Sequence, residues 1–67
     1  MRADKVEVSW DEGKHSWQVR IEAGSEVIRR HCNQPRDSDE ATLRSSALQT
    51  VSDEGYEVDP SRVLVVR

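Results

Sequence analysis

The stretch that most limits how this chain can fold lies between His15 and Ala23, where bulky apolar residues alternate strictly with polar ones. Its apolar positions are Trp17, Val19 and Ile21. A period of two residues is typical of a β-strand that buries one face and exposes the other. We therefore predict a central strand here, against which the neighbouring segments can be registered.

The preceding segment alternates in the same way from Lys5 to Trp10 and predicts a first strand. Residues 11–14 supply turn chemistry, because Asp favours the start of a type I turn and Gly tolerates a positive φ. A four-residue loop over 11–14 pairs Trp10 with His15 and Lys5 with Arg20. A three-residue loop would bring a glutamate opposite a tryptophan, so the four-residue loop is favoured.

A second hairpin turn is predicted at residues 24–25, because a Gly-Ser pair suits a two-residue type II′ turn. This turn pairs Arg20 with Arg29 and leads into a third strand over residues 26–33. Arg30 interrupts the apolar positions of that strand, so its long side chain is expected to run along the sheet edge towards water.

A helix is predicted from Ser38 to about Asp53. Asp37 or Ser38 can cap its start, and Asp37 with Glu40 resembles a capping box. Apolar residues recur on one side at helical spacing, and Gly55 suits the left-handed position after the last turn. The helix is therefore expected to pack one face on the sheet.

The last segment, residues 62–67, contains four consecutive aliphatic residues. Such a run is typical of a strand covered on both faces. Either the strand occupies the middle of the sheet, or its outward residues Leu64 and Val66 meet a second molecule. After a returning helix it should run parallel to its sheet neighbour, but the sequence does not decide between the first and the third strand.

Together these segments predict an α+β fold with the order β-β-β-α-β: an antiparallel three-stranded meander, one helix packed on one face, and a C-terminal strand that joins the sheet or a dimer partner. The 67 residues are interpreted as a single small domain, 1–67. A chain of this length buries only about 60% of the surface of its unfolded form. Because oligomer formation is a common remedy for a thin core, a homodimer is predicted.

One cationic feature follows from the predicted register, which sets Lys5, Arg20 and Arg29 side by side on the face away from the helix. Like charges directly opposite destabilise a sheet by up to about 1 kcal/mol per pair. One interpretation is a solvated face screened by glutamates. The other is an anion or partner site, to which Arg30 and His31 would contribute.

Catalytic and metal chemistry find little support in the sequence. The single cysteine, Cys32, excludes an internal disulfide and a multi-cysteine zinc site, and its neighbour His31 points to the opposite face of a strand. A core thiol is favoured over a nucleophile. Paired ligand spacings and glycine-rich phosphate loops are absent, so no enzyme activity, cofactor, metal or small-molecule substrate is predicted.

The chain has no apolar run of membrane-spanning length and no signal-peptide pattern, and its polar residues 1–4 are expected to fray. Cysteine usage suits a reducing compartment, so a soluble cytoplasmic protein is predicted. The leading interpretation of its function is a non-enzymatic protein-interaction module that forms a homodimer or binds a protein partner. The alternative is a nucleic-acid-binding module that uses the cationic row, although the net charge of −3 disfavours binding through overall charge.

Overall fold

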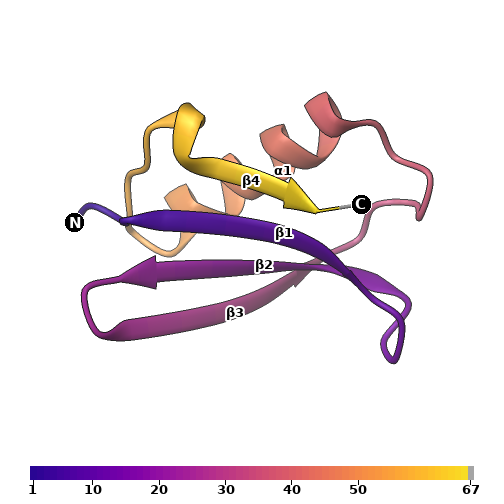
Figure 1. Ribbon diagram of the computed structural model, residues 1–67, viewed down its shortest axis with the longest axis horizontal. Coiled ribbons are helices and arrows are strands. Elements are labelled where there is room, and N and C mark those ends of the chain that lie inside the picture. The colour runs from indigo at the N-terminus through magenta and orange to yellow at the C-terminus, as the bar shows by residue number, and fades with distance from the viewer. Residues whose placement is uncertain (67) are drawn as a thin grey trace.

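The alternating segment is the strand β2 (Ser16–Ala23), and it has a neighbouring strand on each side. The computed structural model describes residues 1–66 and confirms the α+β class. Over these residues the other elements are β1 (Lys5–Asp11), β3 (Glu26–Cys32), α1 (Glu40–Asp53), the short 3-10 helix η1 (Pro60–Arg62) and β4 (Val63–Val66). The strands form one sheet in the order β3-β2-β1-β4 (Figure 1).

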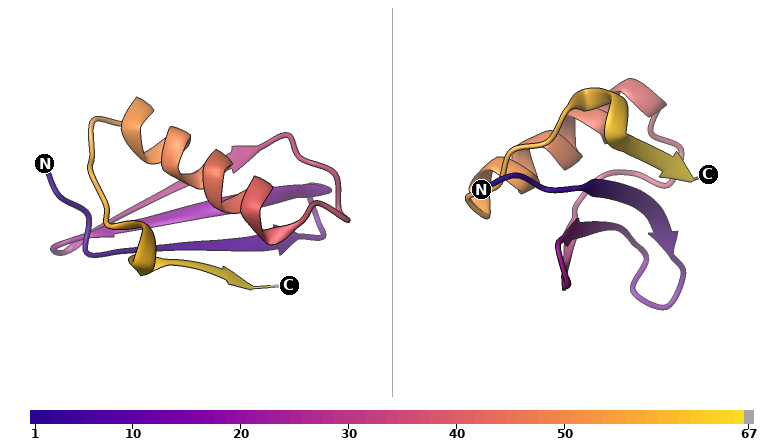
Figure 2. Two further views of the ribbon diagram at one scale, coloured as in Figure 1. Left: turned by 90° about the horizontal axis from the view of Figure 1, so that it is seen from above. Right: turned by 60° about the vertical axis from the view of Figure 1, so that its left-hand side comes forward.

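A single layer of core lies between this sheet and α1, which crosses one face of it (Figure 2). The predicted faces of β1, β2 and the helix are correct, because their large apolar side chains meet in that layer. Ala41 of the predicted apolar arc is exposed instead. The opposite face of the sheet has no covering element among residues 1–66, and it is called the open face below. The buried core consists of Ala3, Val6, Val8, Trp17, Val19, Ile21, Leu43, Ala47, Val51 and Val63.

The register between β1 and β2 differs from the prediction by two residues, since Trp10 lies opposite Trp17 rather than opposite His15. The loop covers residues 12–15, one position later than expected. The Asp11 carboxylate accepts hydrogen bonds from two loop N–H groups, and His15 has a φ of 50°, so the chain is still turning there. A shift of two residues leaves every side chain on its predicted face.

The register between β2 and β3 is as predicted, with Arg20 opposite Arg29 and Gln18 opposite His31. Gly24 has a φ of 61°, which the first central residue of a type II′ turn requires. A two-residue turn leaves no freedom to slide the strands, so the turn sequence alone sets this pairing.

Residues 1–4 were expected to fray, but they are held by hydrogen bonds. Ala3 is only 2% exposed, and its N–H donates to the carbonyl oxygen of Glu57 at 2.7 Å. The Asp4 carboxylate accepts a hydrogen bond from the N–H of Gly24 at 2.8 Å. Residues 1–4 are therefore tied both to the segment after α1 and to the β2–β3 turn.

Helix α1 begins two residues later than predicted and is capped by Asp39, whose side chain accepts a hydrogen bond from the N–H of Thr42 at 2.8 Å. The predicted caps Asp37 and Ser38 are not used. Ser38 is buried, and its hydroxyl instead donates to the carbonyl of Pro35 at 2.7 Å. It belongs to the connector before the helix.

The predicted end of α1 is confirmed. The N–H of Gly55 donates to the carbonyl of Ser52, and the N–H of Tyr56 donates to the carbonyl of Val51, both at 3.0 Å. These two bonds, with a φ of 84° at Gly55, form a Schellman motif.

Strand β4 pairs in parallel with its neighbour, as predicted; that neighbour is β1. It lies at the edge of the sheet, which excludes the first of the two alternatives, a central position. Val63 is buried on the helix side, whereas Leu64 and Val66 are 50% and 46% exposed on the open face. The Arg44 guanidinium fixes the start of β4 by donating to the carbonyls of Pro60 at 3.0 Å and Val63 at 2.6 Å. This contact explains why an arginine lies within the apolar arc of the helix.

Candidate interaction surface

The open face does not carry the predicted cationic row. In the observed register Lys5 lies opposite Glu22, and Glu7 lies opposite Arg20. Of the three predicted cations, Arg20 and Arg29 remain directly opposite one another. Cations and carboxylates therefore alternate between β1 and β2, and Glu22 also lies 3.9 Å from the Arg20 guanidinium.

The predicted site residue Arg30 points to the other side of the sheet. It lies opposite the buried Val19, and its guanidinium donates to the carboxylate of Glu54 at 2.9 Å. This ion pair joins β3 to the C-terminal end of α1. Arg30 lies on the edge strand as expected, and its side chain reaches Glu54. It is on the opposite face of the sheet from Arg20 and Arg29, so the three residues do not form one site.

His31 faces the open side and contacts the last residue of β1, with its Nε2 3.1 Å from the carboxylate of Asp11. The pKa of Asp11 lies below its ordinary value of 3.8, chiefly because of this hydrogen bond from His31. Hydrogen bonds from the backbone N–H groups of Lys14 and Gly13 lower it further, and desolvation opposes them. The pair ties the edge strand β3 to the neighbouring hairpin.

Because the pKa of Asp11 is lowered by folding, its carboxylate stabilises the fold above pH 3.8, and this contribution is lost as the pH falls through the folded pKa. We expect His31→Ala to raise the pKa of Asp11 towards 3.8, but not fully, because the loop N–H groups remain. NMR titration of the side-chain carboxyl carbons measures this directly. Asp59, whose pKa is lowered by Ser61, serves as the control in the same spectra and should not move. An unchanged Asp11 pKa would contradict the assigned cause.

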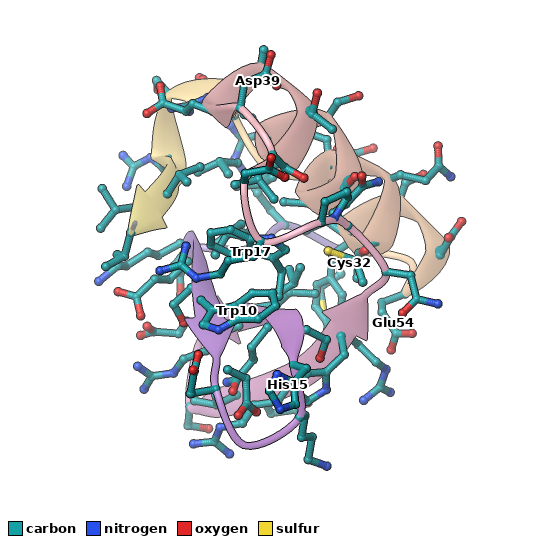
Figure 3. The ribbon with its side chains drawn as sticks, turned by 90° about the vertical axis from the view of Figure 1, so that its right-hand side faces the viewer. Trp10, His15, Trp17, Cys32, Asp39 and Glu54 are labelled. Atoms are coloured by element: carbon teal, nitrogen blue, oxygen red, sulfur yellow. The ribbon has the colours of Figure 1, made fainter. Side chains whose placement is uncertain are left out.

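Two tryptophans and an arginine close one end of the core. The rings of Trp10 and Trp17 meet edge to face, with centroids 5.5 Å apart and planes at 72° (Figure 3). The Arg36 guanidinium lies 5.2 Å and 5.8 Å from the two ring centroids, as in a cation–π contact. The sequence analysis did not predict this contact, because its register did not place Trp10 opposite Trp17.

Cys32 lies on the helix side of β3, away from His31. It is half-buried and packs against the core, and burial raises the pKa of its thiol. The reactive thiolate is therefore a minor species at neutral pH. Over residues 1–66 the surface has no pocket, and no group of three or more His, Cys, Asp or Glu side chains is placed to hold a metal ion.

The two edges of the sheet differ in character. Strand β3 carries charge or imidazole at four of its seven positions, the arrangement that natural sheets use to discourage edge-to-edge pairing. Strand β4 carries only aliphatic side chains from Val63 to Val66. Its predicted outward residues Leu64 and Val66 do face away from the helix, and each is about half exposed. The β4 edge is therefore the candidate interaction surface.

The chain matches no family model, no curated protein and no solved structure. Its function is accordingly inferred from its own residues. Over the described part of the chain, no helix combines the length and the apolar character that crossing a membrane requires.

Proposed function

We propose that this protein is a non-enzymatic protein-interaction module that binds a partner by adding a strand to the edge of β4. The contrast between the two sheet edges carries this proposal. An aliphatic edge without charged side chains lacks one of the main features that discourage pairing with another strand. The opposite edge of the same sheet, β3, carries charged side chains, which discourage pairing with another strand. Strand β4 carries no charged side chain.

The geometry of β4 supports strand addition. In this mode of binding, main-chain hydrogen bonds supply affinity, and alternate side chains supply specificity. Leu64 and Val66 present two adjacent apolar positions on the open face. Arg44 holds the start of β4 through two carbonyl contacts, so the edge is ordered before a partner arrives.

The nucleic-acid alternative loses its main premise with the corrected register. Lys5 and Arg20 each lie opposite a glutamate, and the row of three cations is not formed. Phosphate binding depends on several cations acting along one surface. Titration with labelled duplex and single-stranded nucleic acid at two salt concentrations tests this alternative, and we expect no salt-dependent binding.

A selection from a random peptide display library tests the proposed function. We expect the enriched peptides to contain alternating aliphatic residues and to shift the NMR amide signals of β4 and β1. Leu64→Lys should abolish their binding, while Val27→Lys should preserve it. Val27 is a matched control, since it is 41% exposed on the open face but lies on β3. Peptides that shift signals of β3 or α1 instead would contradict the assignment of the β4 edge.

A further inference from the structure

We infer that the partner of the β4 edge is a second copy of this chain, bound with the two β4 strands antiparallel about a two-fold axis. The inference rests on the proposed function and specifies its partner.

Val63 identifies which main-chain groups point to the free edge. Its N–H donates to the carbonyl of Pro60, and its carbonyl accepts from the Arg44 guanidinium at 2.6 Å. Both groups of Val63 are therefore occupied outside the ladder with β1. Because the groups of successive strand residues point to alternate sides, those of Leu64 point to β1 and those of Val65 point to the free edge.

Among residues 63–66, these groups select one register. Antiparallel strands related by a two-fold axis perpendicular to the sheet place side chains of the same face opposite each other. If Val65 lies opposite Val65 of the second copy, the two residues exchange both of their hydrogen bonds, as in a hydrogen-bonded pair. The register that places Val63 opposite Val65 fails, because Arg44 and Pro60 already occupy the groups of Val63.

The same register joins the exposed aliphatic side chains. Leu64 then lies opposite Val66 of the second copy on the open face, as a non-hydrogen-bonded pair in which side chains come closest. The two symmetric pairs bring four half-exposed aliphatic side chains into one strip. On the other face, the half-buried Val65 meets its own copy beside the two helices, which lie on the same side of the joined sheet.

Pairing with a second copy also limits the assembly to two chains. Pairing β4 with β4 gives a continuous sheet of eight strands, and both of its outer edges are β3. Each β3 edge carries Arg29, Arg30 and His31, so further strands are discouraged and the association stops at two copies. A two-fold interface of this kind needs no second complementary sequence, because each copy offers the same strand.

The proposed interface is short, and this limits the affinity of the dimer. Four residues of one strand and two half-exposed side chains on each copy bury less than the roughly 1,200 Å² at which stable interfaces begin. We therefore expect a weak dimer with a dissociation constant on the order of micromolar or above. Its population depends on protein concentration.

Sedimentation velocity on the full chain, from micromolar to millimolar concentration, tests the inference. We expect the wild-type protein to shift from monomer to dimer across this range. Leu64→Lys should weaken dimerisation by about tenfold or more, since it places charge in the aliphatic strip, while Val27→Lys should match the wild type. In a synthetic chain, an N-methyl group on Val65 removes only the N–H that points to the free edge. This chain should remain monomeric and should keep the circular dichroism spectrum of the wild type.

The register has its own measurement. In a sample that mixes isotope-labelled and unlabelled chains, an intermolecular Hα to Hα contact is expected between Leu64 and Val66, because this pair is the close one. A wild-type protein that stays monomeric at millimolar concentration overturns the second-copy inference, while peptides that still map to β4 would leave the proposed function standing. Equal weakening by Val27→Lys and Leu64→Lys would place the contact on the open face and overturn the edge pairing.

Discussion

Trp17→Ala is expected to lower the free energy of unfolding by about 3–5 kcal/mol, the usual range for removing a buried tryptophan. A domain of this size has a total stability on the order of 3–10 kcal/mol, so the variant should be largely unfolded. Trp17 is fully buried, and its indole Nε1 donates to the carbonyl of Pro35 at 2.8 Å. Truncation would leave a cavity beneath Trp10 and Arg36 and detach the connector. Urea denaturation followed by circular dichroism measures the loss.

Two further variants separate the causes of that loss. Trp10→Ala removes the same chemical group from the same ring pair, but Trp10 is only partly buried, so a clearly smaller loss is expected. Trp17→Phe keeps an aromatic ring and removes the indole donor. The Pro35 carbonyl still accepts from the N–H and the hydroxyl of Ser38, so this variant should lose less than Trp17→Ala. A loss at Trp10 as large as that at Trp17 would show that the core is centred elsewhere.

Leu43→Ala is expected to lower the free energy of unfolding by about 2–5 kcal/mol, because it removes a large side chain of α1 from the core and leaves a cavity. Leu43 is fully buried in the first half of the helix. The measurement is again urea denaturation, with the slope of the transition compared to show that the same surface unfolds.

Leu48→Ala is the matched control for this variant, because it makes the same change on the same helix at a partly buried position. Its loss should be smaller than that of Leu43→Ala. If the two variants lost equal stability, the orientation of α1 on the sheet described above would be wrong.

The two hairpins show why one register could be predicted and the other could not. The turn at Gly24 has two residues, and this length fixes the β2–β3 pairing, beginning with Ala23 opposite Glu26. The loop between β1 and β2 has four residues, and moving it by one position keeps all apolar residues on the core face. The observed loop carries its positive φ at His15, whereas the prediction relied on the glycine at position 13.

The same limit applies to the candidate site. The outward positions of Leu64 and Val66 follow from strand alternation and were predictable. The position of β4 at the edge could not be predicted, because a run of four aliphatic residues can occur both in an edge strand and in a buried strand. The cationic row depended on the β1–β2 register, so that error separated Lys5 from Arg20. The two predicted caps, Asp37 and Ser38, were wrong for another reason: the hydroxyl of Ser38 donates to the carbonyl of Pro35, and Asp39 caps the helix instead.

The pairing of β1 with β4 has a consequence for the order of events during folding. Val6 and Val63 are neighbours in the sheet although almost the whole chain separates them. The two hairpins and α1 are local in the sequence, so they can form while the outer side of β1 still lacks its partner strand. Long-range pairing of this kind closes late and slowly. We therefore expect the docking of β4 on β1 to be a late step in folding.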